Sequence, residues 1–114
     1  MTDLVSMKCD ACRVGAPAAS EDELDKFRAD CPNWEKIETD GVPQFRRVYR
    51  FDNFVQALAF TNQVGNLAEE EGHHPALLTE WGRVTVRWWT HKIRNLHMND
   101  LIMAAKTDQL YSHD

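Results

Sequence analysis

The chain has 114 residues, and 13 basic against 18 acidic side chains give it a formal net charge of −5. This length suits one domain of ordinary size, and the acidic balance argues against direct binding to nucleic acid, which requires a basic surface. With 43% apolar and 27% charged residues, the composition is that of a globular protein rather than a disordered one.

The amino terminus and the cysteines bear on the cellular compartment. No apolar run approaches the roughly 18 residues that a membrane helix requires, and the start of the chain lacks the basic and apolar stretches of a secretory signal. We therefore expect no membrane association and a cytoplasmic protein with free thiols. Cys9 and Cys12 form a CxxC pair within residues 1–19, which we interpret as a flexible arm. The pair supplies only half of a structural zinc site, and a metal site or a disulfide is the alternative.

The first predicted elements are a short helix and two strands. Ser20 and Glu23 have the spacing of a capping box, so a helix is expected to begin after Ser20. A strand over residues 34–38 follows, and an Asp-Gly pair then indicates a turn. A second strand is predicted over 45–51, because aromatic residues alternate there with arginines at a period of two.

The longest helix is predicted to begin at Asp52, as its N-cap, and to end near Glu71, where Gly72 permits a left-handed C-cap. Its acidic end, residues 69–71, lies at the negative pole of the helix dipole, at a cost of about 1 kcal/mol in all. That cost hints at function, although a solvated acidic face is the simpler interpretation. The expected core face has apolar residues spaced by three and four: Phe54, Ala57, Leu58, Val64 and Ala68.

The remaining elements complete the predicted fold. Strands are expected over 77–81 and 84–91, and a last helix is expected to begin at Asn99 or Asp100. Pairs of strands separated by helices favour an α+β fold. We predict a single domain over 20–114, in which three helices pack on one face of a four-stranded antiparallel sheet in the order α-β-β-α-β-β-α.

Three histidines and an aspartate are the candidates for chemistry. His73 and His74 follow a helix end and precede a proline, which favours extended geometry, so their side chains are expected to point in opposite directions. His91 lies on the polar face of the fourth predicted strand, and Asp100 is close enough in sequence to hold an imidazole in one tautomer. Histidine titrates near neutral pH and can donate or accept a proton during turnover.

Other interpretations of these histidines stay open at this point. A single histidine is more often a surface or core residue than a catalytic one. Three histidines can also bind zinc, although adjacent histidines form an awkward pair in a tetrahedral site. No GxSxG, P-loop or GxGxxG motif is present.

The combined pattern resembles the pterin-4a-carbinolamine dehydratase family. The spacings agree without a gap from His73 to Asp100, and the likeness extends over roughly residues 20 to 110. Residues 50–54 are similar to the strand-to-helix junction of that family, and Trp34 falls where the family has a tryptophan near its pocket. The motif consists of Glu69, His73-His74-Pro75, Trp81, Thr90-His91 and Asp100.

The resemblance implies an activity. Members of the family remove water from 4a-hydroxytetrahydrobiopterin to give quinonoid dihydropterin, which recycles the pterin cofactor of aromatic amino acid hydroxylases. The leaving hydroxyl needs a proton and a ring nitrogen must lose one, so general acid–base catalysis suffices without a metal or an organic cofactor. The catalytic set implied by the resemblance is His73, His74, His91 and Asp100. His73 and His91 are its acid–base candidates, His74 orients the pterin, and Asp100 holds His91 or the ring.

The implied substrate-binding residues are Glu69, Pro75, Thr90 and Trp34. The resemblance also implies a homodimer or homotetramer, for which a free edge strand extended across a twofold axis is our interpretation. The alternative function is that of a non-enzymatic dimerisation cofactor, or regulator of transcription, acting through protein–protein contacts.

One departure from the family pattern concerns the last helix. The family often has Gly-Leu-Ser or Gly-Leu-Thr where this chain has Asn95-Leu96-His97. Asn95 tolerates the left-handed conformation, so the turn can form. His97 replaces the usual hydroxyl cap, and Asn99 is the expected substitute.

Overall fold

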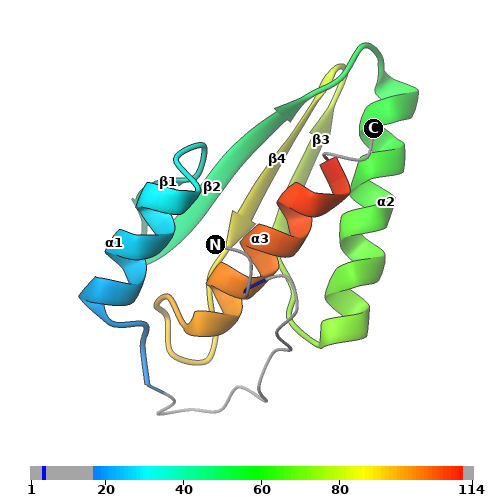
Figure 1. Cartoon of the computed structure of the whole chain (residues 1–114). Helices are drawn as coiled ribbons and strands as arrows, with labels where there is room; N and C mark the ends of the chain where they lie inside the picture. The colour runs from blue at the N-terminus through cyan, green and yellow to red at the C-terminus, as the bar shows by residue number, and fades with distance from the viewer. Residues whose placement is uncertain (1–3, 5–16, 112–114) are drawn as a thin grey trace.

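The framework of the protein is a four-stranded antiparallel sheet in the strand order β1-β2-β4-β3 (Figure 1). The computed structural model describes residue 4 and residues 17–111, so most of the predicted arm, with Cys9 and Cys12, lies outside the described residues. The predicted order of elements and the α+β class are confirmed. The elements are α1 (Glu21–Asp30), β1 (Glu35–Thr39), β2 (Val42–Arg50), α2 (Phe54–Glu71), β3 (Ala76–Glu80), β4 (Arg83–Trp88) and α3 (Met98–Tyr111).

Two tight turns close the hairpins of the sheet. Thr39 pairs with Val42 across Asp40 and Gly41, both of which have positive φ (52° and 78°), as a two-residue turn of this hand requires. The second turn joins β3 to β4 through residues 81–82. Trp81 therefore lies in the turn and is 73% exposed, whereas the sequence had predicted a strand through this residue.

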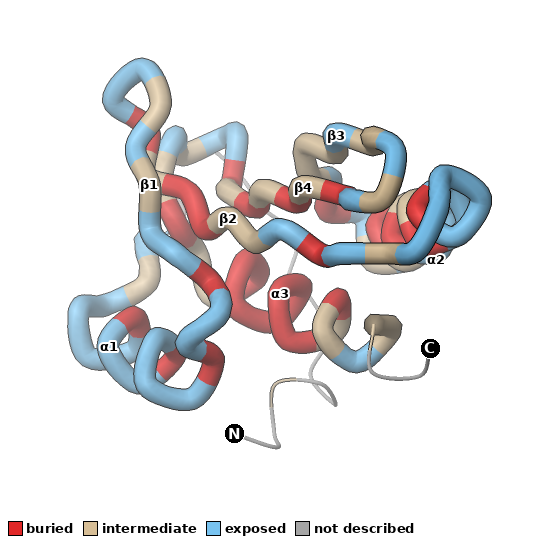
Figure 2. The backbone as a smooth tube through the Cα atoms, turned by 90° about the horizontal axis from the view of Figure 1, so that it is seen from above, coloured by how far each residue is buried: buried red, intermediate tan, exposed pale blue. Residues whose placement is uncertain are grey.

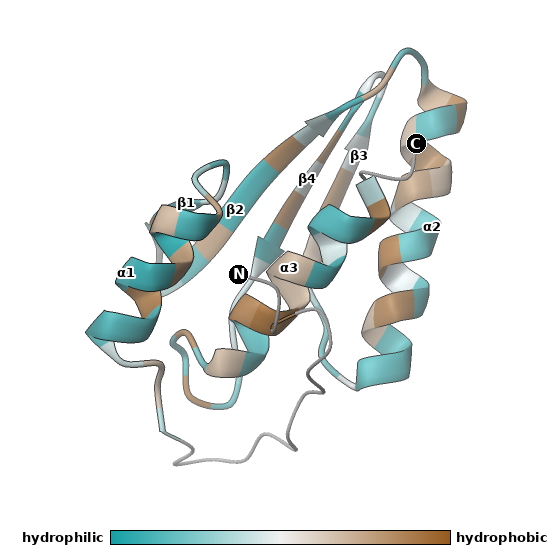
Figure 3. Cartoon of the chain, in the orientation of Figure 1, coloured by the Kyte–Doolittle hydropathy of each residue, from teal (hydrophilic) through white to brown (hydrophobic). Residues whose placement is uncertain are grey.

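One face of the sheet carries the core and is covered by all three helices. Figure 2 shows α3 beneath the sheet between α1 and α2, mostly red in its first half and largely tan toward its end. Strand β2 carries both hydrophobic and hydrophilic residues (Figure 3), and Phe45 and Tyr49, four positions apart, are buried on its core face. Five of the buried residues of the two central strands come from the predicted apolar sets: Phe45, Tyr49, Val84, Val86 and Trp88. Val42 and Gln44 of β2 are buried as well. Within the described ranges, no helix is long and apolar enough to cross a membrane.

The position of α2 differs from the prediction in its cap and in its buried face. Asn53, rather than Asp52, is the N-cap and accepts a hydrogen bond from the backbone N–H of Gln56 at 2.9 Å. Phe54 and Leu58 were predicted in the core, but each is 43% exposed. At 3.6 residues per turn, Leu58 lies about 100° around the helix from Ala57, outside the buried stripe. That stripe consists of Ala57, Phe60, Val64 and Ala68.

The segment between β4 and α3 also differs from the prediction. The left-handed residue is Arg94 (φ 50°), not Asn95, which instead pairs with Thr90 in an isolated antiparallel bridge. Helix α3 begins at Met98, before the predicted start. The side chain at its entrance is His97, whose Nδ1 accepts the backbone N–H of Asn99 at 3.0 Å. Asn99 is thus inside the helix and is not its cap.

Candidate active site

His73 and Asp100 form a buried pair at the centre of the site. Gly72 adopts the left-handed conformation (φ 67°) that ends α2, and this turns His73 inward, where only 6% of the residue is exposed. The Nε2 atom of His73 lies 2.7 Å from Oδ1 of Asp100, a residue with no exposed surface. Two chain segments 27 positions apart therefore meet through one short hydrogen bond.

Both oxygens of the Asp100 carboxylate have donors. Oδ2 accepts hydrogen bonds from Oγ1 of Thr90 at 2.8 Å and from the backbone N–H of His97 at 2.9 Å. The resemblance implied that Asp100 holds His91 or the pterin ring, whereas the hydrogen bonds of this buried carboxylate are to His73, Thr90 and His97, and His91 is exposed. The carboxylate holds His73 instead.

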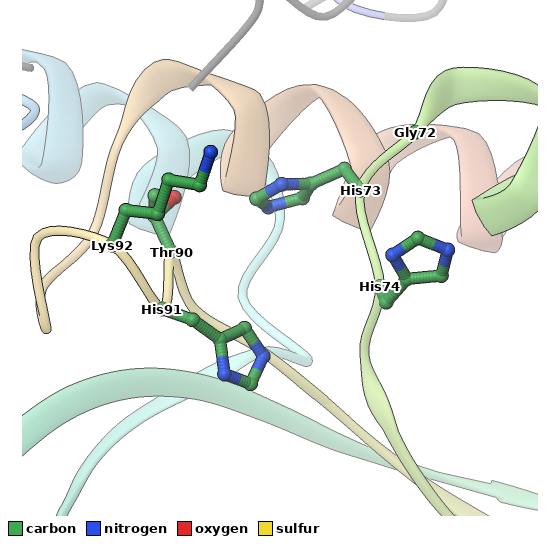
Figure 4. Close-up of a pocket in the computed structure, with 6 residues that line it drawn as sticks. All are labelled: Gly72, His73, His74, Thr90, His91 and Lys92. Carbon is green, nitrogen blue, oxygen red and sulfur yellow. The ribbon is translucent and has the colours of Figure 1, made fainter. Parts of the chain in front are cut away.

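This arrangement selects a tautomer of His73. An ionised carboxylate can only accept hydrogen bonds, so the Asp100 contact places a proton on Nε2 of His73. Nδ1 is then the nitrogen left to exchange a proton with a ligand. The imidazole also lies parallel to the Trp88 ring, with centroids 5.8 Å apart and planes 6° apart, which holds its orientation. Figure 4 shows the ring of His73 pointing toward Thr90 and Lys92, across the pocket.

His74 points away from His73, as extended backbone requires (Figure 4). Its Nε2 lies 2.6 Å from Oε1 of Glu69, and both side chains are mainly exposed, at 58% and 79%. Glu71 forms an ion pair of 3.1 Å with Lys106 of α3, where both side chains are largely buried. Two members of the acidic end of α2 therefore have cationic or imidazole partners, which offset the unfavourable dipole position.

A pocket of about 390 Å³ joins these residues to the loop after β4. Its volume is within the range of small-molecule sites. His91 lies on the loop side of this pocket, with its ring against that of Trp89 at a centroid distance of 4.4 Å. Sequence reasoning did not identify Lys92, whose only signal was its place directly after Thr90-His91. The lining residues are Gly72, His73, His74, Thr90, His91 and Lys92.

Three of the predicted binding residues, Glu69, Trp34 and Pro75, do not line this pocket. Trp34 is 3% exposed, and its indole N–H donates to Oδ2 of Asp108 at 3.0 Å. Arg47 and Tyr49 donate to the same carboxylate, so Trp34 belongs to a polar cluster in the core. Pro75 is half-buried ahead of β3 and does not line the pocket.

The groups available in the pocket are those of proton transfer. Three imidazoles, one hydroxyl and one ammonium border it. In the part of the chain that the structure describes, no three His, Cys, Asp or Glu side chains are grouped to hold a metal ion. The site can thus present both proton donors and proton acceptors to a ligand in the pocket.

Comparison with known proteins places this geometry in context. The sequence profile of the family described as "Pterin 4 alpha carbinolamine dehydratase" matches residues 17–110. A "Putative pterin-4-alpha-carbinolamine dehydratase" from Nitrosococcus oceani is 59% identical over 113 residues, covering 99% of this chain and 100% of the relative. A protein of the same description from Syntrophotalea carbinolica is 59% identical over 110 residues, covering 96% and 98%.

Two solved structures have a similar fold. A transcriptional coactivator/pterin dehydratase from Brucella melitensis superposes with a TM-score of 0.74 at 26% identity, covering 83% of this chain and 99% of the other. A pterin dehydratase-like protein, described as a RuBisCO assembly factor in the alpha-carboxysome, has a TM-score of 0.59 at 22% identity, covering 69% and 89%. The second likeness concerns the fold alone.

Proposed function

This chain belongs to the pterin-4a-carbinolamine dehydratase family, and we propose that it catalyses the dehydration of 4a-hydroxytetrahydrobiopterin to quinonoid dihydropterin in the cytoplasm. The observation that carries the proposal is the buried hydrogen bond between His73 and Asp100 at the edge of a pocket bordered by two more histidines. The reaction would be one step in recycling the pterin cofactor of an aromatic amino acid hydroxylase, because its product, quinonoid dihydropterin, must still be reduced by a separate reductase before the hydroxylase can use it again.

The reaction requires two proton movements. The bond between the ring carbon and the 4a-oxygen breaks, and the leaving hydroxyl takes a proton to become water. A neighbouring ring nitrogen loses its proton, and the electron pair released there forms the new carbon–nitrogen double bond. One acid and one base within hydrogen-bond reach of the pterin are sufficient, and no metal or organic cofactor is needed.

His73 is the first of the two proposed proton carriers. With Nε2–H bonded to Asp100, Nδ1 is free to act as acceptor in the neutral ring or as donor in the protonated ring. The adjacent carboxylate keeps the ring oriented. Stacking on Trp88 adds to this orientation. A preoriented base or acid of this kind contributes about 10²–10⁴-fold to a rate.

His91 is the proposed second carrier, because it borders the same pocket from the opposite segment. His74, held by Glu69, would bind and orient the ring from its exposed side. We also propose that Pro75 and the backbone near Thr90 contact the pterin edge. The hydroxyl of Thr90 donates to Asp100, so its proposed role is to hold the carboxylate.

The decisive experiment generates 4a-hydroxytetrahydropterin in situ with a phenylalanine hydroxylase and follows its dehydration spectroscopically. We expect the protein to accelerate the step above its spontaneous rate, and His73→Ala to remove most of the acceleration. A rate equal to the spontaneous one would refute the proposal. Elemental analysis of the active protein is a necessary companion, since stoichiometric zinc would contradict the metal-free mechanism.

A second candidate function is protein binding. The Brucella melitensis structure carries the description of a transcriptional coactivator as well as of a pterin dehydratase. In this chain, α2 exposes three apolar side chains on its first turns: Phe54 at 43%, Val55 at 75% and Leu58 at 43%. Exposed apolar surface of this kind suits a protein interface.

The binding candidate and the assembly of the protein are tested together. We propose a homodimer or homotetramer, for which β1 and β3 are the free sheet edges. Light scattering after size exclusion measures the assembly, with a monomer as the contradicting result. If Phe54→Ser and Val55→Ser leave both the assembly and the dehydration rate unchanged, the exposed α2 surface remains available to a partner. Dissociation in these variants would assign it to self-association.

A further inference from the structure

His97 occupies the entrance of α3 in an arrangement that histidine seldom provides. It directly precedes Met98, the first residue of the helix. Its Nδ1 accepts the backbone N–H of Asn99 at 3.0 Å, and its own backbone N–H donates to Oδ2 of Asp100 at 2.9 Å. Its carbonyl oxygen accepts the backbone N–H of Asp100 at 2.9 Å. These contacts form a reciprocal cap in which an imidazole replaces the usual hydroxyl or carboxylate.

The cap constrains the protonation of His97. Nδ1 can accept a hydrogen bond only when it carries no proton, so the capping form is the neutral ring with its proton on Nε2. A hydrogen on Nδ1 would face the N–H of Asn99, donor against donor. The neutral Nε2–H tautomer is therefore part of the structure at the start of α3.

The same cap includes the carboxylate of the active site. Asp100 is the third residue of α3, and its Oδ2 is shared by the backbone N–H of His97 and the hydroxyl of Thr90. Its Oδ1 faces Nε2 of His73. If the first turn of α3 frays, the N–H of His97 moves and one donor to Oδ2 is lost. The direction of Oδ1 toward His73 then depends on Thr90 alone.

We propose that His97 is a positioning residue of the active site, which aims the Asp100 carboxylate at His73 by capping α3 with its Nδ1 atom. His97 does not line the pocket and transfers no proton to the substrate. The effect on the rate rests on the proposed dehydratase function. The effect on the His73–Asp100 hydrogen bond does not depend on that function. The role of His97 and the dehydratase function can therefore be tested separately.

The test compares four variants of the full chain. His97→Ala removes the acceptor, and His97→Ser restores one. His97→Gly also removes the acceptor but suits the cap position, so it replaces the alanine variant if that protein does not fold. Asn53→Ala is the matched control. Asn53 caps the N-terminal end of α2, the end away from His73, and its side chain also accepts a backbone N–H of the first turn. For each variant we measure kcat, KM, Tm and the NMR signals of the histidine ring nitrogens and their protons.

The expected results separate positioning from stability. In the native protein, the nitrogen-15 chemical shift of His97 Nδ1 should be that of an unprotonated nitrogen that accepts a hydrogen bond. His97→Ala and His97→Gly should lower kcat about 10-fold, leave KM nearly unchanged, and broaden the signal of the proton between His73 and Asp100. His97→Ser should restore both. Asn53→Ala should lower Tm by about 5 °C without either effect.

Three outcomes would overturn the inference. A proton on Nδ1 of native His97 contradicts the cap. An unchanged His73 proton signal in both His97→Ala and His97→Gly contradicts the coupling to Asp100. An equal fall of kcat in Asn53→Ala shows that general destabilisation is responsible. If no variant, including the native protein, dehydrates the pterin, the proposed function fails, and the NMR signals still decide the role of His97.

Discussion

The substitution Asp100→Asn is the sharpest test of the site, because it changes the acceptor beside His73 with little change in shape. Complete removal by Asp100→Ala would leave two buried donors, His73 Nε2 and Thr90 Oγ1, and the half-buried N–H of His97 without an acceptor. Each donor without an acceptor costs about 1–3 kcal/mol, so the free energy of unfolding would fall by about 3–9 kcal/mol. The total free energy of unfolding of a domain of this size is about 5–15 kcal/mol. The alanine variant would therefore confuse folding with catalysis.

Asparagine has one acceptor and one donor end. Its oxygen is best placed at the former Oδ2 position, which faces two donors, Thr90 and the backbone of His97. The amide NH₂ then faces Nε2 of His73, which must become an acceptor. The proton of the neutral imidazole moves to Nδ1, the pocket side. His73 in this tautomer cannot accept a proton from the substrate through Nδ1.

We expect kcat to fall by about 10²–10⁴, the usual contribution of a positioned general acid or base. Stability should fall by about 1–3 kcal/mol, because charge-assisted hydrogen bonds become neutral ones. The assays are steady-state kinetics, urea unfolding and NMR assignment of the His73 tautomer. Native kcat with a reversed tautomer would refute the role of His73 as base. An unchanged tautomer would refute the hydrogen-bond analysis.

Four further predictions follow from the placement of individual side chains. His91→Ala should lower kcat while Tm stays within about 1 °C, because the side chain is exposed; native kcat would remove His91 from the mechanism. Trp34→Phe should cost about 1 kcal/mol through the lost hydrogen bond to Asp108 and leave KM unchanged, whereas a raised KM would place Trp34 at the substrate. Burial and the Asp108 carboxylate raise the pKa of Tyr49 well above its usual 10.0. The folded state therefore favours the neutral phenol, and its contribution is complete below about pH 10 and lost as the pH rises above it; Tyr49→Phe should flatten the alkaline fall in urea stability, and an unchanged slope would contradict this. Burial, followed by the charge of Asp108, raises the pKa of the Cys31 thiol to about 11, so mass spectrometry should find Cys31 unmodified by iodoacetamide at about pH 8 until the protein unfolds.

Local signals in the sequence were reliable guides to the fold. Ser20 and Glu23 form the predicted capping box, with both reciprocal hydrogen bonds. Gly72 takes the predicted left-handed C-cap. These features depend on residues within a few positions of one another, so the sequence contains nearly all of the relevant contacts.

The errors concern caps and turns at one or two positions and the rotation of one helix against the sheet. Asn53 rather than Asp52 caps α2, a shift of one position between two residues that both favour the cap. Phe54 and Leu58 fit a helical period, but the rotation of α2 against the sheet exposes both. Asn95 was predicted to adopt the left-handed conformation. In the structure it pairs with Thr90 in an isolated bridge, and the neighbouring Arg94 has the positive φ instead. Helical or turn periodicity alone does not determine how an element is rotated or paired.

By itself, the sequence determined the order of the elements, the family resemblance and the identity of the histidines in one pocket. It could do so because caps, turns and strand alternation are local, and because the spacing from His73 to Asp100 is distinctive. Only the tertiary structure decided that Asp100 holds His73 rather than His91, that Trp34 belongs to the core, and that His97 connects the helix cap to the site. The pairing of His73 with Asp100 joins side chains 27 residues apart. A contact over that separation depends on how α2 and α3 pack against the same sheet, which no local pattern specifies.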